Sequence, residues 1–195
     1  IVIYNISSRT AVNIEPETFA QLAAVKHIVA VKESSGNLEQ MSRILQATEG
    51  RLTLLSGDDA LTLPVLAIGG TGVISVAANL VPRDTAALVR AFQAGRQAEA
   101  LDAHRTLLPL IRALFLETNP IPVKTAMGLL GMCSPELRLP LCAMEGANLE
   151  RLKAALEEYG LLKSKTLVIT QKAEGSPPRL ARRAGRGKQI WRSNS

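Results

Sequence analysis

The 195-residue sequence has few of the residues that mark several classes of protein. Its two cysteines, Cys133 and Cys142, cannot build a disulfide framework and have no histidines at zinc-ligand spacing. No uninterrupted apolar run approaches the roughly 18 residues of a membrane-spanning helix. No charged segment followed by an apolar stretch and a cleavage site opens the chain. These absences favour a reduced, cytoplasmic protein that does not span a membrane.

Positive charge is concentrated in one segment. The formal net charge is +6 and the pI is about 9.7, yet residues 163–195 carry a net +8 and residues 1–162 a net −2. We expect a disordered basic tail of low complexity at 163–195. A nucleic-acid-binding protein is the alternative from a different class, but the tail has one aromatic residue, Trp191, and no recognisable nucleic-acid-binding fold.

The first half of the chain alternates between two kinds of segment. Continuous apolar, β-branched runs are typical of parallel strands buried on both faces. Amphipathic helical patterns separate them. The expected strands are 1–4, 28–31, 52–55 and 72–76, and the expected helices are 16–24, 38–47, 59–68 and 84–94. This alternation predicts an α/β fold with a parallel sheet.

After Gly95 the strand signals stop and only helical patterns continue, at 97–115, 123–130 and 149–159. The sequence therefore predicts three regions. These are an α/β part at 1–95, a helical domain at 96–162 and the basic tail at 163–195.

Lys32 ends one of the buried strand runs, and this position is unusual because a strand interior disfavours an ammonium group. Partial desolvation favours the neutral amine, which is the nucleophile for a Schiff base with a carbonyl substrate. The alternative interpretation is a lysine that extends to the rim of the sheet or pairs with Glu33.

Tyr4 ends another apolar run and is expected to point towards the same edge of the sheet. Its phenol can relay protons, and Arg9 can hold a carboxylate through two parallel hydrogen bonds. The alternatives are a core tyrosine with a satisfied hydroxyl and a solvated arginine in a loop.

Three further features have ordinary structural interpretations. The glycine-rich segment 69–72 either binds phosphate or forms a tight turn into a strand, and the turn is favoured because the phosphate-loop lysine is missing. Asp58 and Asp59 either bind a metal ion or cap a helix, and capping is favoured. His27 and His104 are isolated and form no catalytic triad.

Taken together, these motifs resemble those of the dihydrodipicolinate synthase (4-hydroxy-tetrahydrodipicolinate synthase) family. The resemblance runs in order from residue 1 to residue 162. The segments that carry it are YNISSRT at 4–10, VKESSGN at 31–37, LSGDD at 55–59, GGTGVISVAAN at 69–79, NPIPVK at 119–124 and RLPL at 138–141.

The resemblance implies a TIM (β/α)8 barrel, of which 1–95 is the second half, with a C-terminal helical domain and assembly as a homotetramer. It implies condensation of pyruvate with aspartate 4-semialdehyde in the diaminopimelate branch of lysine biosynthesis, with no metal or organic cofactor. Lys32 would form the Schiff base, Tyr4 would relay protons and Arg9 would bind the semialdehyde carboxylate. The backbone carbonyl of Ile74 would face the site. A related pyruvate-dependent aldolase such as N-acetylneuraminate lyase is the alternative within this class.

The sequence departs from the family pattern in two ways. It has Ser7 where the family usually has proline and Ala11 where the family often has glycine, which affects the loop that carries Arg9. It also has four expected strands, whereas a barrel has eight strands in about 250 residues. We therefore expect a piece of a longer protein, with two open sheet edges and an exposed barrel interior, that is inactive and unstable or aggregated by itself unless two half-barrels pair.

Overall fold

The computed structural model of the chain describes residues 1–163. The predicted basic tail therefore lies, from residue 164 onwards, outside the described residues. Within the part that is described, no helix combines the length and the apolar character needed to cross a membrane.

Four short parallel strands form one sheet in the order β1-β2-β3-β4. Tyr4 lies beside Lys32 in this register, and Lys32 lies beside Leu55, which lies beside Gly72. The predicted parallel α/β sheet is confirmed. The strands are β1 (Val2–Asn5), β2 (Ala30–Glu33), β3 (Thr53–Ser56) and β4 (Gly72–Val73).

Helices follow each strand and continue beyond the last one. The early ones are α1 (Ser7–Thr10), α2 (Pro16–Leu22), α3 (Leu38–Ala47), the 3-10 turn η1 (Asp59–Leu61) and α4 (Thr62–Ala67). The later ones are the 3-10 turn η2 (Ala77–Asn79), α5 (Pro82–Gln93), α6 (Gln97–Ala113), α7 (Ile121–Leu129) and α8 (Gly146–Glu158). Helix α1 was not predicted, because four residues are too few to show a helical period.

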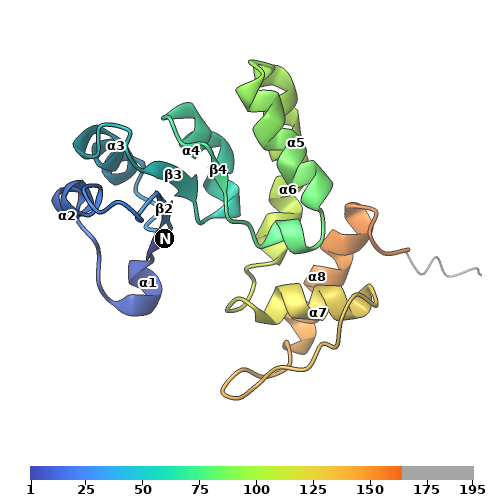
Figure 1. Ribbon diagram of the computed structural model, residues 1–195. Coiled ribbons are helices and arrows are strands. Elements are labelled where there is room, and N and C mark those ends of the chain that lie inside the picture. The colour runs from blue at the N-terminus through green and yellow to red at the C-terminus, as the bar shows by residue number, and fades with distance from the viewer. Residues whose placement is uncertain (164–195) are drawn as a thin grey trace, which may run out of the picture. The chain divides into compact units, whose positions relative to one another are not determined.

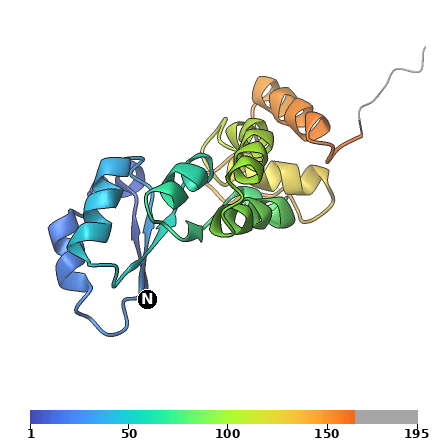
Figure 2. The same cartoon turned by 90° about the horizontal axis from the view of Figure 1, so that it is seen from above.

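One face of the sheet is covered by α2 and α3, which lie side by side (Figure 2). Helix α3 begins after Asn37, whose side chain accepts a hydrogen bond from the backbone N–H of Gln40. The apolar stripe of these helices then packs on the strands. The fully buried members of this cluster are Phe19, Val31, Met41, Ile44, Leu52, Leu54 and Val65.

A second hydrophobic cluster joins α5, α6, α7 and α8, and it includes side chains from both sides of residue 95. Helices α5 and α6 lie side by side (Figure 1). The largest fully buried side chains here are leucines at helical spacing. They are Leu88, Leu110, Leu114, Leu152 and Leu156.

The opposite face of the sheet remains largely open, and we call it the open face. Val2, Tyr4 and Ile74 expose 44%, 45% and 41% of their surface. The prediction that the strands are buried on both faces is therefore wrong for this face. The predicted open edges are confirmed, because β1 and β4 end the strand order in the described residues. An apolar strand run has the same sequence pattern whatever segment covers its second face, so the exposed interior was expected only from the count of four strands against the eight of a barrel.

Candidate functional site

Tyr4 and Lys32 meet on the open face at the carboxyl end of the sheet. They are register partners on β1 and β2. The Lys32 Nζ lies 3.9 Å from the centre of the Tyr4 ring, within the range of a cation–π contact. Tyr4 is nearly half exposed, so the core-tyrosine alternative does not apply. The structure thus brings the two predicted residues together where a ligand can reach both.

Lys32 does not pair with its neighbour Glu33, so that alternative is wrong. Successive side chains of a strand point to opposite faces. Glu33 is fully buried on the helix-covered side, where its carboxylate accepts hydrogen bonds from Asn5 Nδ2 at 2.8 Å and from the Ser35 backbone N–H at 2.6 Å. The partly exposed Lys32 amine is therefore not tied to the adjacent carboxylate.

The Glu33 carboxylate belongs to a polar network that sequence reasoning missed. Gln40 Nε2 donates to Glu33 Oε2 at 3.4 Å and to Asn13 Oδ1 at 3.1 Å, and Asn5 Nδ2 also donates to Asn13 at 3.0 Å. The network links the ends of β1 and β2 to α3. The sequence feature that could have indicated this network is the pair of polar residues, Asn5 and Glu33, that directly follow Tyr4 and Lys32. By holding these neighbours, the network fixes the backbone that carries the candidate site.

Gly57, directly after β3, leaves the space that the Lys32 side chain occupies. A Cβ atom at Gly57 would overlap the Ser34 Oγ and would lie 3.0 Å from Lys32 Cε. The Ser34 hydroxyl is buried and has no hydrogen-bond partner in the described residues. A glycine is required at this position by close approach of side chains rather than by backbone conformation.

Asp59 holds the segment that follows Ile74. Its carboxylate accepts hydrogen bonds from the Ser75 hydroxyl and, at 2.8 Å, from the Val76 backbone N–H. The backbone N–H of Ile74 donates to the Ser56 carbonyl at 2.9 Å. Burial raises the pKa of Asp59 above its ordinary value, and the hydrogen bonds from Ser75 and Val76 oppose this shift. Ile74 is therefore fixed on both sides, although it lies in an irregular segment.

The capping interpretation of the adjacent carboxylates is supported for Asp58, which accepts a hydrogen bond from the Ala60 backbone N–H at 2.8 Å. Among the described residues, no three His, Cys, Asp or Glu side chains gather in a way that could hold a metal ion.

The turn interpretation of the glycine-rich segment is supported as well. The Gly70 backbone N–H donates to the Val65 carbonyl at 2.8 Å, and this turn leads into the amino end of β4. It therefore lies at the edge of the sheet opposite to Lys32.

Arg9 lies on α1, which follows β1, and it is exposed. Its Nη2 donates to the carbonyl of Asn119 at 3.2 Å, which links this loop to the segment before α7. Ala11 ends α1 in the left-handed conformation, with φ of 58°. A side chain is disfavoured there, so Ala11 stores a small backbone strain next to Arg9.

Comparison with known proteins places this geometry in a family. Residues 1–159 match the model of the "Dihydrodipicolinate synthetase family". The chain is 54% identical over 164 residues to 4-hydroxy-tetrahydrodipicolinate synthase of Endomicrobium trichonymphae, covering 84% of this chain and 56% of that protein.

Solved structures of the same family are also similar to this chain. A dihydrodipicolinate synthase from Aquifex aeolicus aligns with a TM-score of 0.81 and 48% identity, over 84% of this chain and 57% of the other. The chloride-inhibited enzyme of Acinetobacter baumannii, complexed with pyruvate, aligns with a TM-score of 0.79 and 30% identity, over 83% and 55%.

The chain spans about half the length of the curated relatives it matches. The matched half includes both strands that bring Tyr4 and Lys32 together, and the match extends through α8. The chain therefore belongs to the dihydrodipicolinate synthetase family.

Proposed function

We propose that this chain contributes the Schiff-base residues of a 4-hydroxy-tetrahydrodipicolinate synthase, a cytoplasmic lyase that condenses pyruvate with aspartate 4-semialdehyde. The observation that carries the proposal is the placement of Lys32 over Tyr4 at the carboxyl edge of a parallel sheet. In barrels of alternating strands and helices, this edge carries the active site. The pyruvate-complexed relative from Acinetobacter baumannii supports the choice of substrate.

Each site residue then has a role that fits its position. The Lys32 amine attacks the ketone carbon of pyruvate, and loss of water gives the Schiff base. Tyr4, in contact with the amine, passes the protons that this step moves. Loss of a proton from the pyruvate methyl group produces the carbon nucleophile that attacks the aldehyde. Arg9 binds the semialdehyde carboxylate, and the Ile74 carbonyl faces the reacting groups.

The open face and the two free edges support a larger architecture around this chain. We propose that residues 1–95 are the second half of a (β/α)8 barrel and that 96–162 are its C-terminal helical domain, within a homotetramer. Four further strands would pair with β1 and β4 and would bury the open face. Residues 163–195 form a separate basic tail in this proposal. Until a complementary half is supplied, the chain is catalytically inactive.

The test is complementation. The chain is co-expressed with the part of the Endomicrobium trichonymphae synthase that lies outside the match, and pyruvate is trapped on lysine with borohydride. Peptide mass spectrometry should locate the adduct on Lys32 in the complex and find none in the chain alone. Lys32→Arg should abolish trapping while preserving the complex, because the guanidinium keeps the charge but is not nucleophilic.

The outcomes separate the parts of this proposal. A complex that forms and turns over without an adduct on Lys32 would overturn the role of Lys32. Trapping by the chain alone would overturn its dependence on a second half. Cleavage of sialic acid by the complex, with no consumption of aspartate semialdehyde, would identify an N-acetylneuraminate lyase instead.

A further inference from the structure

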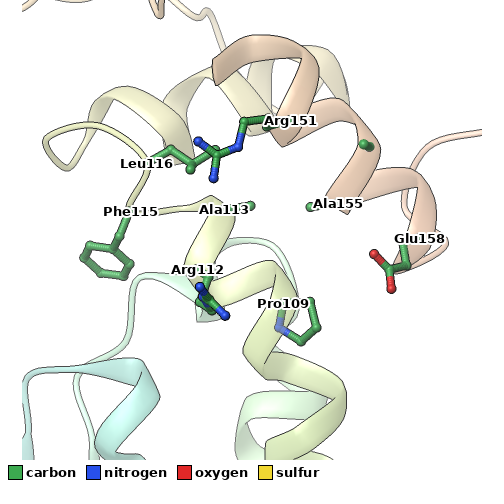
Figure 3. Close-up of a pocket in the computed structure, with 9 residues that line it drawn as sticks. Pro109, Arg112, Ala113, Phe115, Leu116, Arg151, Ala155 and Glu158 are labelled. Atoms are coloured by element: carbon green, nitrogen blue, oxygen red, sulfur yellow. The ribbon is translucent and has the colours of Figure 1, made fainter. Parts of the chain in front are cut away.

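The hydroxyl oxygen of Ser34 is a buried polar atom that the fold of this chain does not use. It is shielded from solvent and forms no hydrogen bond within the described residues. A buried hydroxyl without a partner lowers stability, so its presence in a folded protein calls for a functional explanation. The depression between α6 and α8 gives no comparable indication, because it is open and its two arginines, Arg112 and Arg151, stand apart (Figure 3).

The Ser34 hydroxyl lies beside the stem of the Lys32 side chain. Side chains two residues apart along a strand point to the same face, so Ser34 follows Lys32 onto the open face. Both side chains border the space that Gly57 leaves. A Cβ atom at Gly57 would overlap Ser34 Oγ and would lie 3.0 Å from Lys32 Cε and 3.1 Å from Lys32 Cγ. The lysine stem therefore passes next to the hydroxyl, and Nζ is one bond beyond Cε.

The backbone holds Ser34 in this place and gives the next serine a different task. The Ser34 N–H donates to the Asn5 carbonyl at 2.9 Å, which continues the pairing of β2 with β1 beyond the last strand residue. Ser35 Oγ accepts a hydrogen bond from the Asn37 N–H at 3.2 Å and so shapes the turn before α3. Of these two adjacent serines, only Ser34 has a hydroxyl that is left for the Lys32 site.

Lys32 needs different partners in its two charge states. As an ammonium group it is attracted to the Tyr4 ring, and Nζ lies 3.9 Å from the ring centre. The neutral amine lacks the charge that this attraction requires, yet it is the form that attacks a ketone. A neutral amine that leaves the ring therefore needs a hydrogen-bond partner next to the lysine stem, which is where the Ser34 hydroxyl lies.

We propose that Ser34 is a positioning residue for the Lys32 amine. When Nζ has lost its proton and turns away from the Tyr4 ring, Ser34 Oγ accepts a hydrogen bond from it, and the nitrogen lone pair is left for the ketone carbon. Rotation about the last bonds of the lysine stem makes this move with the backbone unchanged. Ser34 forms and breaks no covalent bond and keeps its proton. This role rests on the proposed function, because it belongs to the same Schiff-base step.

Two measurements on Ser34→Ala separate positioning from structural support. In the full chain, the variant should raise the urea midpoint of unfolding, because it removes a buried hydroxyl without a partner. In the complemented complex, it should lower the saturating rate of borohydride trapping on Lys32 about five- to ten-fold, while the half-saturating pyruvate concentration stays within about two-fold. Ser34→Thr keeps the hydroxyl and should retain the trapping rate within about two-fold.

Ser35→Ala is the matched control. It should lower the urea midpoint, since it removes the turn contact with the Asn37 N–H, and it should leave trapping unchanged. An unchanged trapping rate in Ser34→Ala would overturn the positioning role. A slower rate together with a lower urea midpoint would also overturn it, because the hydroxyl would then be structural. Absence of an adduct on Lys32 in the unaltered complex would instead overturn the proposed function, and the role of Ser34 with it.

Discussion

The two faces of the sheet differ in what this chain provides. The helix-covered face is complete, because Phe19 and Val31 have no exposed surface and the Glu33 carboxylate has its hydrogen-bond partners. The open face has exposed apolar side chains and carries Tyr4 and Lys32. One face of the strands therefore holds the buried contacts that stabilise the fold, and the opposite face carries the candidate catalytic residues. Neighbouring residues of one strand should therefore respond very differently to mutation.

Mutation of two adjacent residues of β2 should show the largest difference between the two faces. Glu33→Ala should lower the free energy of unfolding by about 3 kcal/mol, because it leaves the buried Asn5, Ser35 and Gln40 donors without their acceptor. Lys32→Ala should cost less than about 1 kcal/mol, since it removes only a partly exposed cation–π contact. Urea unfolding followed by circular dichroism measures both. Equal costs would mean that the two faces are not energetically distinct.

Asp59 extends the comparison to the carboxyl edge. Asp59→Ala should cost about 2 kcal/mol, because it leaves the Ser75 hydroxyl and the Val76 backbone N–H without the carboxylate that accepts from them. Asp58→Ala is the matched control and should cost less, about 1 kcal/mol, since it removes one capping hydrogen bond, from the Ala60 backbone N–H. Urea unfolding at neutral pH compares the two variants.

The buried Asp59 carboxyl group also predicts that the free energy of unfolding depends on pH. Burial raises the pKa of Asp59 in the folded chain above the ordinary aspartate value of 3.8. The folded state therefore binds the carboxyl proton more tightly than the unfolded state. The Asp59 contribution to stability should therefore be fully present below pH 3.8 and should decline as the pH rises through the folded pKa. Unfolding measured across this range should show a decline of stability in the parent chain that is missing from Asp59→Ala. If stability falls with pH equally in both proteins, Asp59 does not have a raised pKa in the folded chain.

Gly57 tests whether Lys32 on the open face needs the space beside it. Gly57→Ala should slow borohydride trapping of pyruvate on Lys32 about ten-fold in the complemented complex, because the new methyl group displaces Ser34 Oγ and crowds Lys32 Cε. Gly146→Ala, where a Cβ meets no atom within 4 Å, is the control. An unchanged trapping rate in Gly57→Ala would show that Lys32 does not need this space.

The smallest expected change in stability concerns Ala11, which ends α1 next to Arg9. Ala11→Gly should stabilise the chain by about 1 kcal/mol, because glycine adopts the positive φ of 58° without strain. The exposed Ala154 in the middle of α8 is the matched control, and Ala154→Gly should destabilise by about 1 kcal/mol. Thermal unfolding distinguishes the opposite signs. If both variants lose stability, Ala11 is not strained.

Sequence reasoning predicted the four strands of the described residues and the placement of Tyr4 and Lys32 at the same edge of the sheet, since parallel strands bring the residues that end them to one edge. It placed strand 72–76 too long, because the Asp59 hydrogen bonds turn Ser75 and Val76 out of the sheet. It missed the Glu33 network, because a sequence does not show which face of a strand a segment elsewhere will cover. The catalytic roles of Lys32, Tyr4, Arg9 and Ile74 stay predictions.

The sequence by itself determined the order of strands and helices and the family, because periodicity, caps and motifs such as VKESSGN are local properties of the chain. Tertiary packing determines that Glu33 is buried while Lys32 is partly exposed, that Gly57 leaves space for Lys32, and that Asp59 holds the segment after Ile74. These contacts join residues far apart in the chain. Burial and hydrogen bonding at such contacts depend on how the elements pack, which no local pattern specifies.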